Sequence, residues 1–327
     1  MKASALLVLL AAPVAAAFVP SSVPFVRNAA TSTSLSMAVT TAQIKELRDA
    51  TGAGMMDCKK ALIETDGDVD AANEWLRKSG LVKADKKAAR TAAEGKIIVA
   101  TSEGKSVMVE VNCETDFVAK DDGFLGFANT VAQAAAAAES EDVATIMGSP
   151  DDNDSLEATR QALVAKIGEN IQVRRVAGMG SADTVVGDYV HFGKIGVLVE
   201  LEGGTPQLAT DVAMHVAAMN PPYATAEQVP AEDLEKEKSI LAAQVAESGK
   251  PPEIIEKMVE GRLRKYLEEI CLVSQTYVKT GDKTVGKYLE ENGAKMIGFK
   301  RIEVGEGIEK KVDDFAAEVA KMAGGGK

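Results

Sequence analysis

The stretches Val107-Met108-Val109-Glu110-Val111 and Val197-Leu198-Val199-Glu200-Leu201 share one pattern and decide the fold that this sequence predicts. Both are short and rich in β-branched and other apolar residues, which is typical of strands buried in a sheet. A loop and an alanine-rich helical stretch follow each of them, at residues 124–138 and 208–219. A hairpin followed by a helix, occurring twice, predicts an α+β core of two related subdomains in which helices pack on small antiparallel sheets.

The other strands and helices of this core are predicted from similar patterns. Residues 96–101 and 105–112 form a predicted hairpin across Glu103 and Gly104. The remaining predicted elements are strands at 171–176, 185–191, 195–201 and 296–304, and helices at 156–167 and 285–291.

Ahead of the core, residues 38–82 predict a small module of three helices. Ile44 and Leu47 mark the apolar face of the first helix, and Asp68 is a suitable N-cap for the third. Gly80 is expected to end the third helix, because glycine favours the left-handed conformation that follows many helices. Helices of about ten residues are too short to be stable alone, so we expect their apolar stripes to pack on one another.

Two charged helical stretches, 230–246 and 253–269, flank Gly249-Lys250-Pro251-Pro252 and predict a helical hairpin that projects from the core or dimerises. The whole chain is then expected to be organised as 1–36, a presequence; 38–82, the three-helix module; 95–168, the first core subdomain; 169–229 and 271–312, the second core subdomain; 230–270, the inserted hairpin; and 313–327, a C-terminal helix from 313 to 322 with its tail.

The first 36 residues differ in composition from the rest, because they contain Lys2 and Arg27 but no acidic residue. An apolar run from Ala3 to Val14, followed by small residues, has the layout of a secretory signal and is short for a membrane span. The Ser/Thr-rich stretch 18–36 is typical of a transit peptide. Together they resemble the presequence of plastid proteins in algae with complex plastids. We therefore expect the plastid stroma, with no membrane association after import; a mitochondrial or a secreted protein is the alternative.

Composition and charge exclude several classes of function. With 46% hydrophobic and 26% charged residues among 327, the chain has the composition of a soluble globular protein. Its formal net charge of −12 would repel phosphate backbones, so direct nucleic-acid binding is not expected. Three widely spaced cysteines, Cys58, Cys113 and Cys271, favour a reducing compartment over a disulfide framework.

The sequence offers little material for catalysis. Its only histidines are His191 and His215, and it lacks the serine-elbow, P-loop and dinucleotide-binding motifs. His215 lies in an apolar helical stretch and is expected to be structural. Cys113 would be the nucleophile if the protein were a thiol-dependent enzyme, but without a partnered histidine a buried structural thiol is favoured. No enzymatic activity, cofactor or metal site is therefore expected.

Apolar residues occur where loops should be polar. Met55 and Met56 follow a glycine-rich turn, and adjacent methionines cannot both face one small core. One of them is a candidate for a pliable binding surface, and partial burial of both is the alternative. The loop Thr115-Asp116-Phe117-Val118 places an aromatic ring beside a carboxylate just past a strand. Taken alone, this pattern favours a Phe117 that packs in the core.

Taken together, these motifs resemble the elongation factor Ts family. Residues 42–62 resemble its ubiquitin-associated-like N-terminal domain, and Asn112-Cys113-Glu114-Thr115-Asp116-Phe117-Val118-Ala119-Lys120 resembles its signature loop. Further matches follow in order along the chain, at residues 165–170, 214–218, 256–262 and 299–307. The resemblance runs from about Ala38 to Met322.

The resemblance implies a guanine nucleotide exchange factor of protein biosynthesis whose partner is elongation factor Tu, in its GDP-bound and nucleotide-free states. Within the loop Thr115–Val118, Asp116 and Phe117 are implied to enter elongation factor Tu beside its magnesium site. Disturbance of Mg²⁺ and of the phosphate-binding loop would then release GDP, so that GTP can bind. The ring of Phe117 is thus implied to be a contact residue.

The resemblance also implies further contacts with elongation factor Tu. Met55, Met56 and Lys59 would contact its nucleotide-binding domain, while His191 and Val278 would face another of its domains. One departure affects Val278, because this chain has Thr276-Tyr277 where the family pattern has Pro-Phe.

The predicted hairpin at 230–270 would be the family's dimerisation or projecting subdomain, which leaves a homodimer open. The competing hypotheses are a ubiquitin-associated-type binding module and a thiol-dependent enzyme that uses Cys113.

Overall fold

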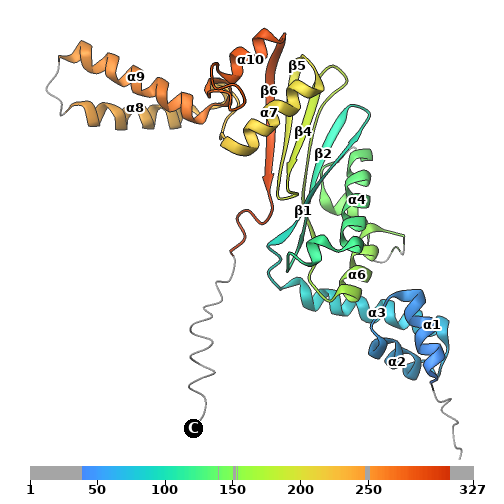
Figure 1. Ribbon diagram of the computed structural model, residues 1–327. Helices are drawn as coiled ribbons and strands as arrows, with labels where there is room; N and C mark the ends of the chain where they lie inside the picture. Colours follow the sequence, from blue (N-terminus) through green and yellow to red (C-terminus); the bar gives the residue numbers. More distant parts are fainter. Residues whose placement is uncertain (1–38, 139, 150–151, 153, 247–250, 310–327) are drawn as a thin grey trace, which may run out of the picture. The chain divides into compact units, whose positions relative to one another are not determined.

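The computed structural model describes residues 39–138, 140–149, 152, 154–246 and 251–309. The predicted presequence, 1–36, and the predicted C-terminal helix, 313–322, lie outside these residues. Helices and two small antiparallel sheets make up the described chain, which confirms the predicted α+β class (Figure 1).

Three helices form the N-terminal module: α1 (Thr41–Thr51), α2 (Met55–Glu64) and α3 (Val69–Ala88). Helix α1 begins with a capping box, in which the Thr40 hydroxyl accepts from the Gln43 N–H and the Gln43 side chain accepts from the Thr40 N–H. The apolar faces pack on one another as predicted. The buried residues of this small core are Ile44, Leu47, Cys58, Ala61, Leu62 and Ala72.

Helix α3 is longer than predicted. It does not end at Gly80 but continues to Ala88, past the predicted module boundary at residue 82. A Cβ on Gly80 would lie 3.5 Å from the Cβ of Ala165, so α3 packs closely on α6 (Leu156–Ile167) at this point. The packing of α3 on α6 outweighs the ~1 kcal/mol that glycine costs inside a helix.

Two three-stranded antiparallel sheets form the core. In each sheet the repeated stretch is the central strand. In the first sheet the strand order is β1 (Glu94–Ser102), β2 (Lys105–Cys113), β3 (Gln172–Met179). In the second sheet it is β4 (Val185–His191), β5 (Ile195–Gly203), β6 (Ala294–Glu303).

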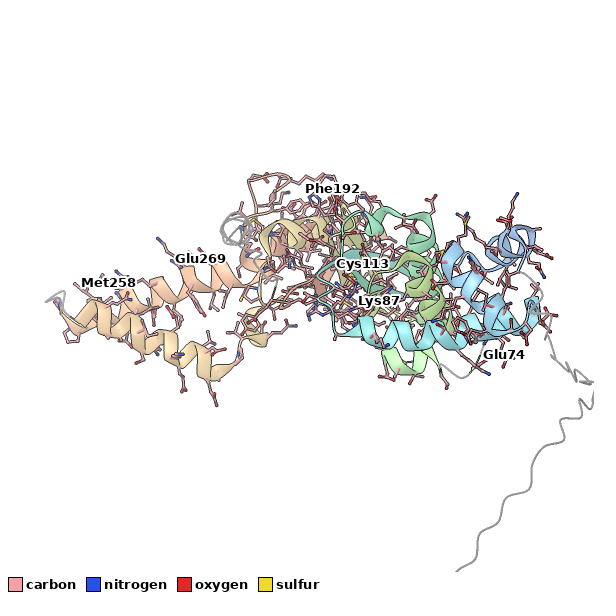
Figure 2. The ribbon with its side chains drawn as sticks, turned by 90° about the horizontal axis from the view of Figure 1, so that it is seen from below. Glu74, Lys87, Cys113, Phe192, Met258 and Glu269 are labelled. Atoms are coloured by element: carbon pink, nitrogen blue, oxygen red, sulfur yellow. The ribbon has the colours of Figure 1, made fainter. Side chains whose placement is uncertain are left out.

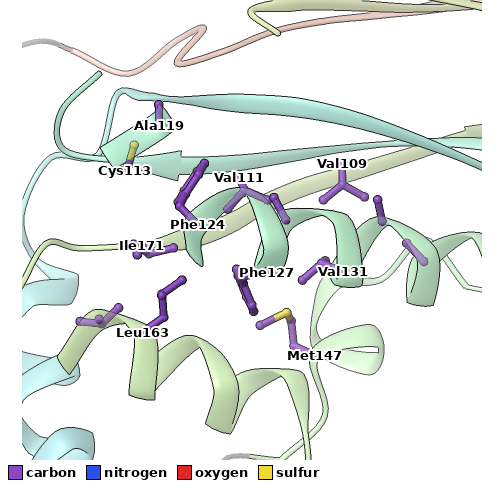
Figure 3. Close-up of a cluster of buried hydrophobic side chains, with 14 of the residues drawn as sticks. Val109, Val111, Cys113, Ala119, Phe124, Phe127, Val131, Met147, Leu163 and Ile171 are labelled. Atoms are coloured by element: carbon purple, nitrogen blue, oxygen red, sulfur yellow. The ribbon is translucent and has the colours of Figure 1, made fainter. Parts of the chain in front are cut away.

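The two central strands are packed in equivalent ways. The odd-numbered residues of 107–111 pack with α4 (Asp122–Ala137), and those of 197–201 pack with α7 (Pro206–Met219). Figure 3 shows Val109 and Val111 facing the aromatic and aliphatic side chains of α4. The alternate positions, Met108 and Leu198, meet in a buried cluster between the sheets. The core therefore stacks helix, sheet, sheet and helix.

Glycine allows these layers to approach closely at two positions. A Cβ on Gly187 of β4 would lie 2.3 Å from the backbone nitrogen of Thr210 in α7. A Cβ on Gly196 of β5 would lie 2.6 Å from a side-chain carbon of Ile97 in the other sheet. A larger residue at either position would push two layers apart.

A buried carboxylate joins the first sheet to the end of β6. Glu110 of β2 is completely buried and accepts from Arg174 Nη1 at 3.2 Å and from Arg175 Nε at 2.5 Å. It also accepts from Asn112 Nδ2 at 3.1 Å and from the N–H of Gly305, just past β6, at 2.8 Å. Burial raises the pKa of Glu110, but these hydrogen bonds outweigh it and hold the pKa below its usual value.

Short helices and a helical hairpin complete the described chain. The hairpin consists of α8 (Ala231–Ala246) and α9 (Pro252–Ile270), which pack on each other. The short helices are η1 (Val118–Lys120), α5 (Val143–Met147), η2 (Ala226–Gln228), η3 (Leu272–Ser274) and α10 (Val285–Glu291). Among the residues described, no helix combines the length and the apolar composition that a membrane span requires.

Candidate functional site

The loop that follows β2 is held by a carboxylate from another part of the core. Glu169, just past α6, accepts from the N–H groups of Glu114 and Thr115 at 3.1 and 3.0 Å. It also accepts from the Thr115 hydroxyl at 2.7 Å. The Glu114 side chain in turn accepts from the N–H of Asn170 at 2.7 Å. These bonds hold the backbone at the start of the loop in one conformation.

Asp116 and Phe117 are the residues of this loop that project into solvent. Phe117 is 80% exposed and Asp116 is exposed, whereas Thr115 and Val118 are partly buried. Lys120 lies beside both, with its Nζ 2.9 Å from an oxygen of Asp116 and 5.9 Å from the centre of the Phe117 ring. The hydrogen bond from Lys120 lowers the pKa of Asp116. The interpretation of Phe117 as a core residue, taken from the pattern alone, is therefore wrong.

A second apolar surface lies at the start of α2. Met55 is 54% exposed and Met56 is 75% exposed, and Lys59 is exposed on the same helix. Residues three and four positions apart share one face of a helix, so Lys59 lies beside both methionines. The alternative, in which both methionines are partly buried in the module, does not hold.

His191 lies at the end of β4, in the turn that leads to β5. It is exposed, and its Nδ1 is 2.9 Å from the Tyr189 hydroxyl. The next residue, Phe192, packs edge-on against the His191 ring with centroids 4.4 Å apart. Phe192 is 81% exposed and is not among the contact residues predicted from the sequence. In Figure 2 it lies at the edge of the core, whereas Cys113 lies inside.

The structure brings the turn after β4 and the 115–118 loop to the same end of the two sheets. Lys194 donates to the Glu94 carboxylate at 2.6 Å. Glu94 is the first residue of β1 and pairs with Cys113, the last residue of β2. The methionines of α2 and Val278 belong to other elements, so the predicted contact residues form several patches.

Val278 follows η3 and is held by a buried histidine. It is 56% exposed, and its N–H donates to Nδ1 of His215 at 3.2 Å. Nε2 of His215 donates to Oε1 of Gln275 at 3.0 Å. Burial lowers the pKa of His215, so its imidazole stays neutral and keeps Nδ1 free to accept. His215 is therefore structural, as predicted, and it positions the backbone of Val278.

Tyr277, the departure next to Val278, is buried against Tyr288, with the two rings stacked 4.4 Å apart. By distance and angle its hydroxyl oxygen has no hydrogen-bond partner among the described residues. Burial raises the pKa of Tyr277, and the neighbouring Tyr288 hydroxyl contributes to the raised pKa. The site thus accommodates the ring of a phenylalanine better than the hydroxyl of a tyrosine.

Tyr277→Phe is therefore expected to raise the free energy of unfolding by about 1 kcal/mol, because it removes an unsatisfied buried hydroxyl without leaving a cavity. Urea denaturation followed by circular dichroism measures the change. Tyr266→Phe is the control, since the side chain of Tyr266 on α9 is only partly buried and should give a change below about 0.5 kcal/mol. A loss of stability in Tyr277→Phe would show that the hydroxyl is bonded in solution.

The surroundings of Cys113 contradict the hypothesis of a thiol-dependent enzyme. The residue is completely buried, and burial raises the pKa of its thiol to about 12. Its thiol donates to the carbonyl oxygen of Thr115 at 3.1 Å. A buried thiol with such a pKa supplies almost no thiolate at neutral pH, which disfavours Cys113 as a nucleophile. Within the described ranges there is also no group of three or more His, Cys, Asp or Glu side chains that could hold a metal ion.

This chain is similar to known proteins named Elongation factor Ts. The family model described as Elongation factor TS matches residues 114–306. A relative from Thioalkalivibrio sulfidiphilus named Elongation factor Ts is 57% identical over 292 residues, which are 88% of this chain and 100% of the relative. Relatives of the same name from Xanthomonas campestris pv. campestris and Xanthomonas oryzae pv. oryzae are 54% and 53% identical over 291 residues, which are 88% of this chain and 99% of each relative.

Proposed function

Since this chain belongs to the elongation factor Ts family, we propose that it is the guanine nucleotide exchange factor of elongation factor Tu in protein synthesis. It binds elongation factor Tu that carries GDP, promotes the release of GDP, and leaves an empty site that GTP can fill. The observation that carries this proposal is the exposed Phe117 ring on an anchored loop.

Asp116 and Phe117 act as a wedge beside the magnesium site of elongation factor Tu. GTPases hold their nucleotide through Mg²⁺ and the backbone N–H groups of the phosphate-binding loop. Displacement of either one weakens the binding of GDP. Because Glu169 already holds the start of the loop, little conformational entropy is lost when the wedge enters its partner.

The exchange reaction is a coupling of two binding equilibria. A factor that lowers the affinity of elongation factor Tu for GDP must itself bind more weakly when GDP is present, by the same factor. No covalent bond is made or broken, so the protein is not an enzyme in this proposal, and it needs no cofactor of its own.

Other exposed residues add binding area away from the nucleotide. Met55, Met56 and Lys59 contact the nucleotide-binding domain of elongation factor Tu, where flexible thioethers adapt to the partner's surface. His191 and Val278 contact a second domain. These contacts set the affinity of the complex, whereas Asp116 and Phe117 drive the release of GDP.

Release of a fluorescent GDP analogue from elongation factor Tu tests the proposal. The protein without residues 1–36 should accelerate release strongly at micromolar concentration. Cys113→Ala is the control for the enzyme hypothesis and should keep nearly the full rate. Binding to elongation factor Tu without any acceleration of release would overturn the exchange function.

We further propose that residues 1–36 direct the protein to a plastid, with the mitochondrion as the alternative destination. The bacterial relatives align over almost their full length with 88% of this chain. The remaining share of this chain is about as long as the predicted presequence. A fluorescent protein fused behind residues 1–36 should accumulate in plastids. Accumulation in mitochondria or outside the cell would contradict the proposal.

The hairpin of α8 and α9 is proposed to form a homodimer. Ile240 of α8 and Ile254 of α9 are both exposed on it, which leaves apolar area for a second copy of the chain. Sedimentation equilibrium of the protein and of Ile254→Lys tests this. A dimer that the variant dissociates is the expected result, and a monomer in both cases would contradict it.

A further inference from the structure

The turn between β4 and β5 presents a phenylalanine in a backbone conformation that disfavours it. The φ angle of Phe192 is 51°, in the left-handed region where bulky residues are outliers. This conformation costs free energy, and the side chain recovers little of it by packing because it is 81% exposed. Strained residues of this kind are concentrated at functional sites.

The corresponding turn of the first repeat shows what such a turn normally carries. Between β1 and β2, Glu103 has a φ angle of 49° and is followed by Gly104. Between β4 and β5, Phe192 is likewise followed by Gly193, in a loop one residue longer. Glu103 is exposed and charged, as expected of a turn in water. The conformation of the turn therefore does not require an aromatic ring.

The turn that carries Phe192 is braced against both sheets. The Lys96 ammonium donates to the carbonyl oxygen of Phe192 at 3.1 Å, and the N–H of Ile97 donates to the carbonyl oxygen of Gly193 at 2.9 Å. On the other side, the N–H of Val304 donates to the carbonyl oxygen of Lys194 at 2.9 Å. Figure 1 shows this turn beside the start of β1 and the end of β6. The backbone that carries Phe192 is thus held in place.

Phe192 and Phe117 are the two most exposed of the large hydrophobic residues in the described chain, and both lie at one end of the sheets. Glu94 contacts residues near both phenylalanines. It pairs with Cys113, four residues before Phe117, and its carboxylate accepts from Lys194, two residues after Phe192. The equivalent turn with Glu103 lies at the opposite end of its strands, away from Phe117. The aromatic residue therefore occurs at the turn that lies on the side of the exchange loop.

We propose that Phe192 is a second aromatic anchor, which inserts into an apolar recess of the same elongation factor Tu molecule that Phe117 enters. This inference rests on the proposed function. An exposed aromatic ring on an anchored turn, beside a contact loop, has the properties of a binding hot spot. Phe192 acts on the affinity of the complex and not on the release step, because it does not belong to the 115–118 loop. Phe192 selects partners whose apolar recess is separated from their nucleotide site by the same distance that separates Phe192 from Phe117.

Phe192→Glu copies the side chain of the equivalent turn, and Phe192→Gly removes the ring together with the backbone strain. In the GDP-release assay both variants should raise the concentration of factor needed for half-maximal acceleration by about tenfold or more, with the rate at saturation unchanged. The melting temperature of Phe192→Gly should be equal to or higher than that of the wild type. Glu103→Gln is the control at the other turn and should change neither quantity.

The outcomes separate this inference from the proposed function. If the wild type accelerates release and Phe192→Glu reaches half-maximal acceleration at the same concentration, the inference is overturned and the exchange function stands. If the wild type binds elongation factor Tu without accelerating release, calorimetric titration of both proteins still decides the inference, since only Phe192→Glu should bind more weakly. If the wild type does not bind at all, both proposals fail.

Discussion

Phe117→Ala is expected to lower the maximal rate of GDP release by about 10- to 100-fold, because a central aromatic contact typically contributes about 2 kcal/mol or more. The ring is 80% exposed in the free protein, so its removal should change the free energy of unfolding by less than about 0.5 kcal/mol. Stopped-flow release of a fluorescent GDP analogue at saturating factor measures the rate, and urea denaturation measures the stability.

A matched control for this variant is Ile297→Ala. Ile297 is also an exposed hydrophobic residue, but it lies near the end of β6 that is remote from the 115–118 loop and from the turn with Phe192. It should leave the rate of release unchanged. A Phe117→Ala protein that releases GDP at the wild-type rate would show that the wedge is formed by other residues.

Glu110→Gln is expected to lower the free energy of unfolding by about 2–4 kcal/mol. The carboxylate is completely buried and accepts hydrogen bonds from Arg174, Arg175, Asn112 and the backbone of Gly305. Removal of one partner from a buried ion pair leaves the other charges uncompensated, which typically costs 3–5 kcal/mol. The two arginines are only partly buried and remain partly solvated, so the expected loss begins below this range. Urea denaturation at pH 7 measures the loss.

The repeat supplies a control for this substitution. Glu200 occupies the position in β5 that Glu110 occupies in β2, but it is partly exposed and accepts from the Thr184 hydroxyl at 2.7 Å. Glu200→Gln should therefore cost less than about 1 kcal/mol. Equal losses in the two variants would contradict the assignment of the buried carboxylate as the group that joins the first sheet to the end of β6.

The effect of Glu110→Gln should also depend on pH. The folded protein holds the pKa of Glu110 below the usual value of 4.5, so the carboxylate binds a proton more readily in the unfolded chain. Its contribution is thus fully present above pH 4.5 and is lost as the pH falls through the lower pKa of the folded state. The difference in stability between wild type and Glu110→Gln should shrink below pH 4.5. A constant difference down to pH 3 would contradict this.

The strands and helices of the core follow closely from local patterns. Val107–Val111 and Val197–Leu201 are indeed central strands, because alternate apolar residues in a buried strand fit a layer on each face. The end of α3 was predicted wrongly at Gly80, since only the packing of α3 on α6, with Ala165 beside Gly80, shows that the helix continues there. Local propensity does not contain that contact.

The sequence also pointed to the residues of the candidate site, but not to what holds them. The motif that contains Asp116 and Phe117 was recognisable, and the structure adds that Phe117 is exposed. Glu169 and His215 hold the backbone near Thr115 and Val278 from distant parts of the chain, so no local signal identifies these roles. For Phe192 there was a signal, namely an aromatic residue before a turn glycine, where asparagine or aspartate is usual.

By itself, the sequence determined the α+β class, the internal repeat, the family resemblance and the motif of the exchange loop, because each of these is written in residues that are neighbours along the chain. The tertiary structure decided which apolar residues face solvent, which distant carboxylates and histidines hold the contact loops, and that the turn with Phe192 lies beside the loop with Phe117. Exposure and proximity depend on how the two sheets pack against each other and their helices, and that packing arises from contacts between residues far apart in the sequence.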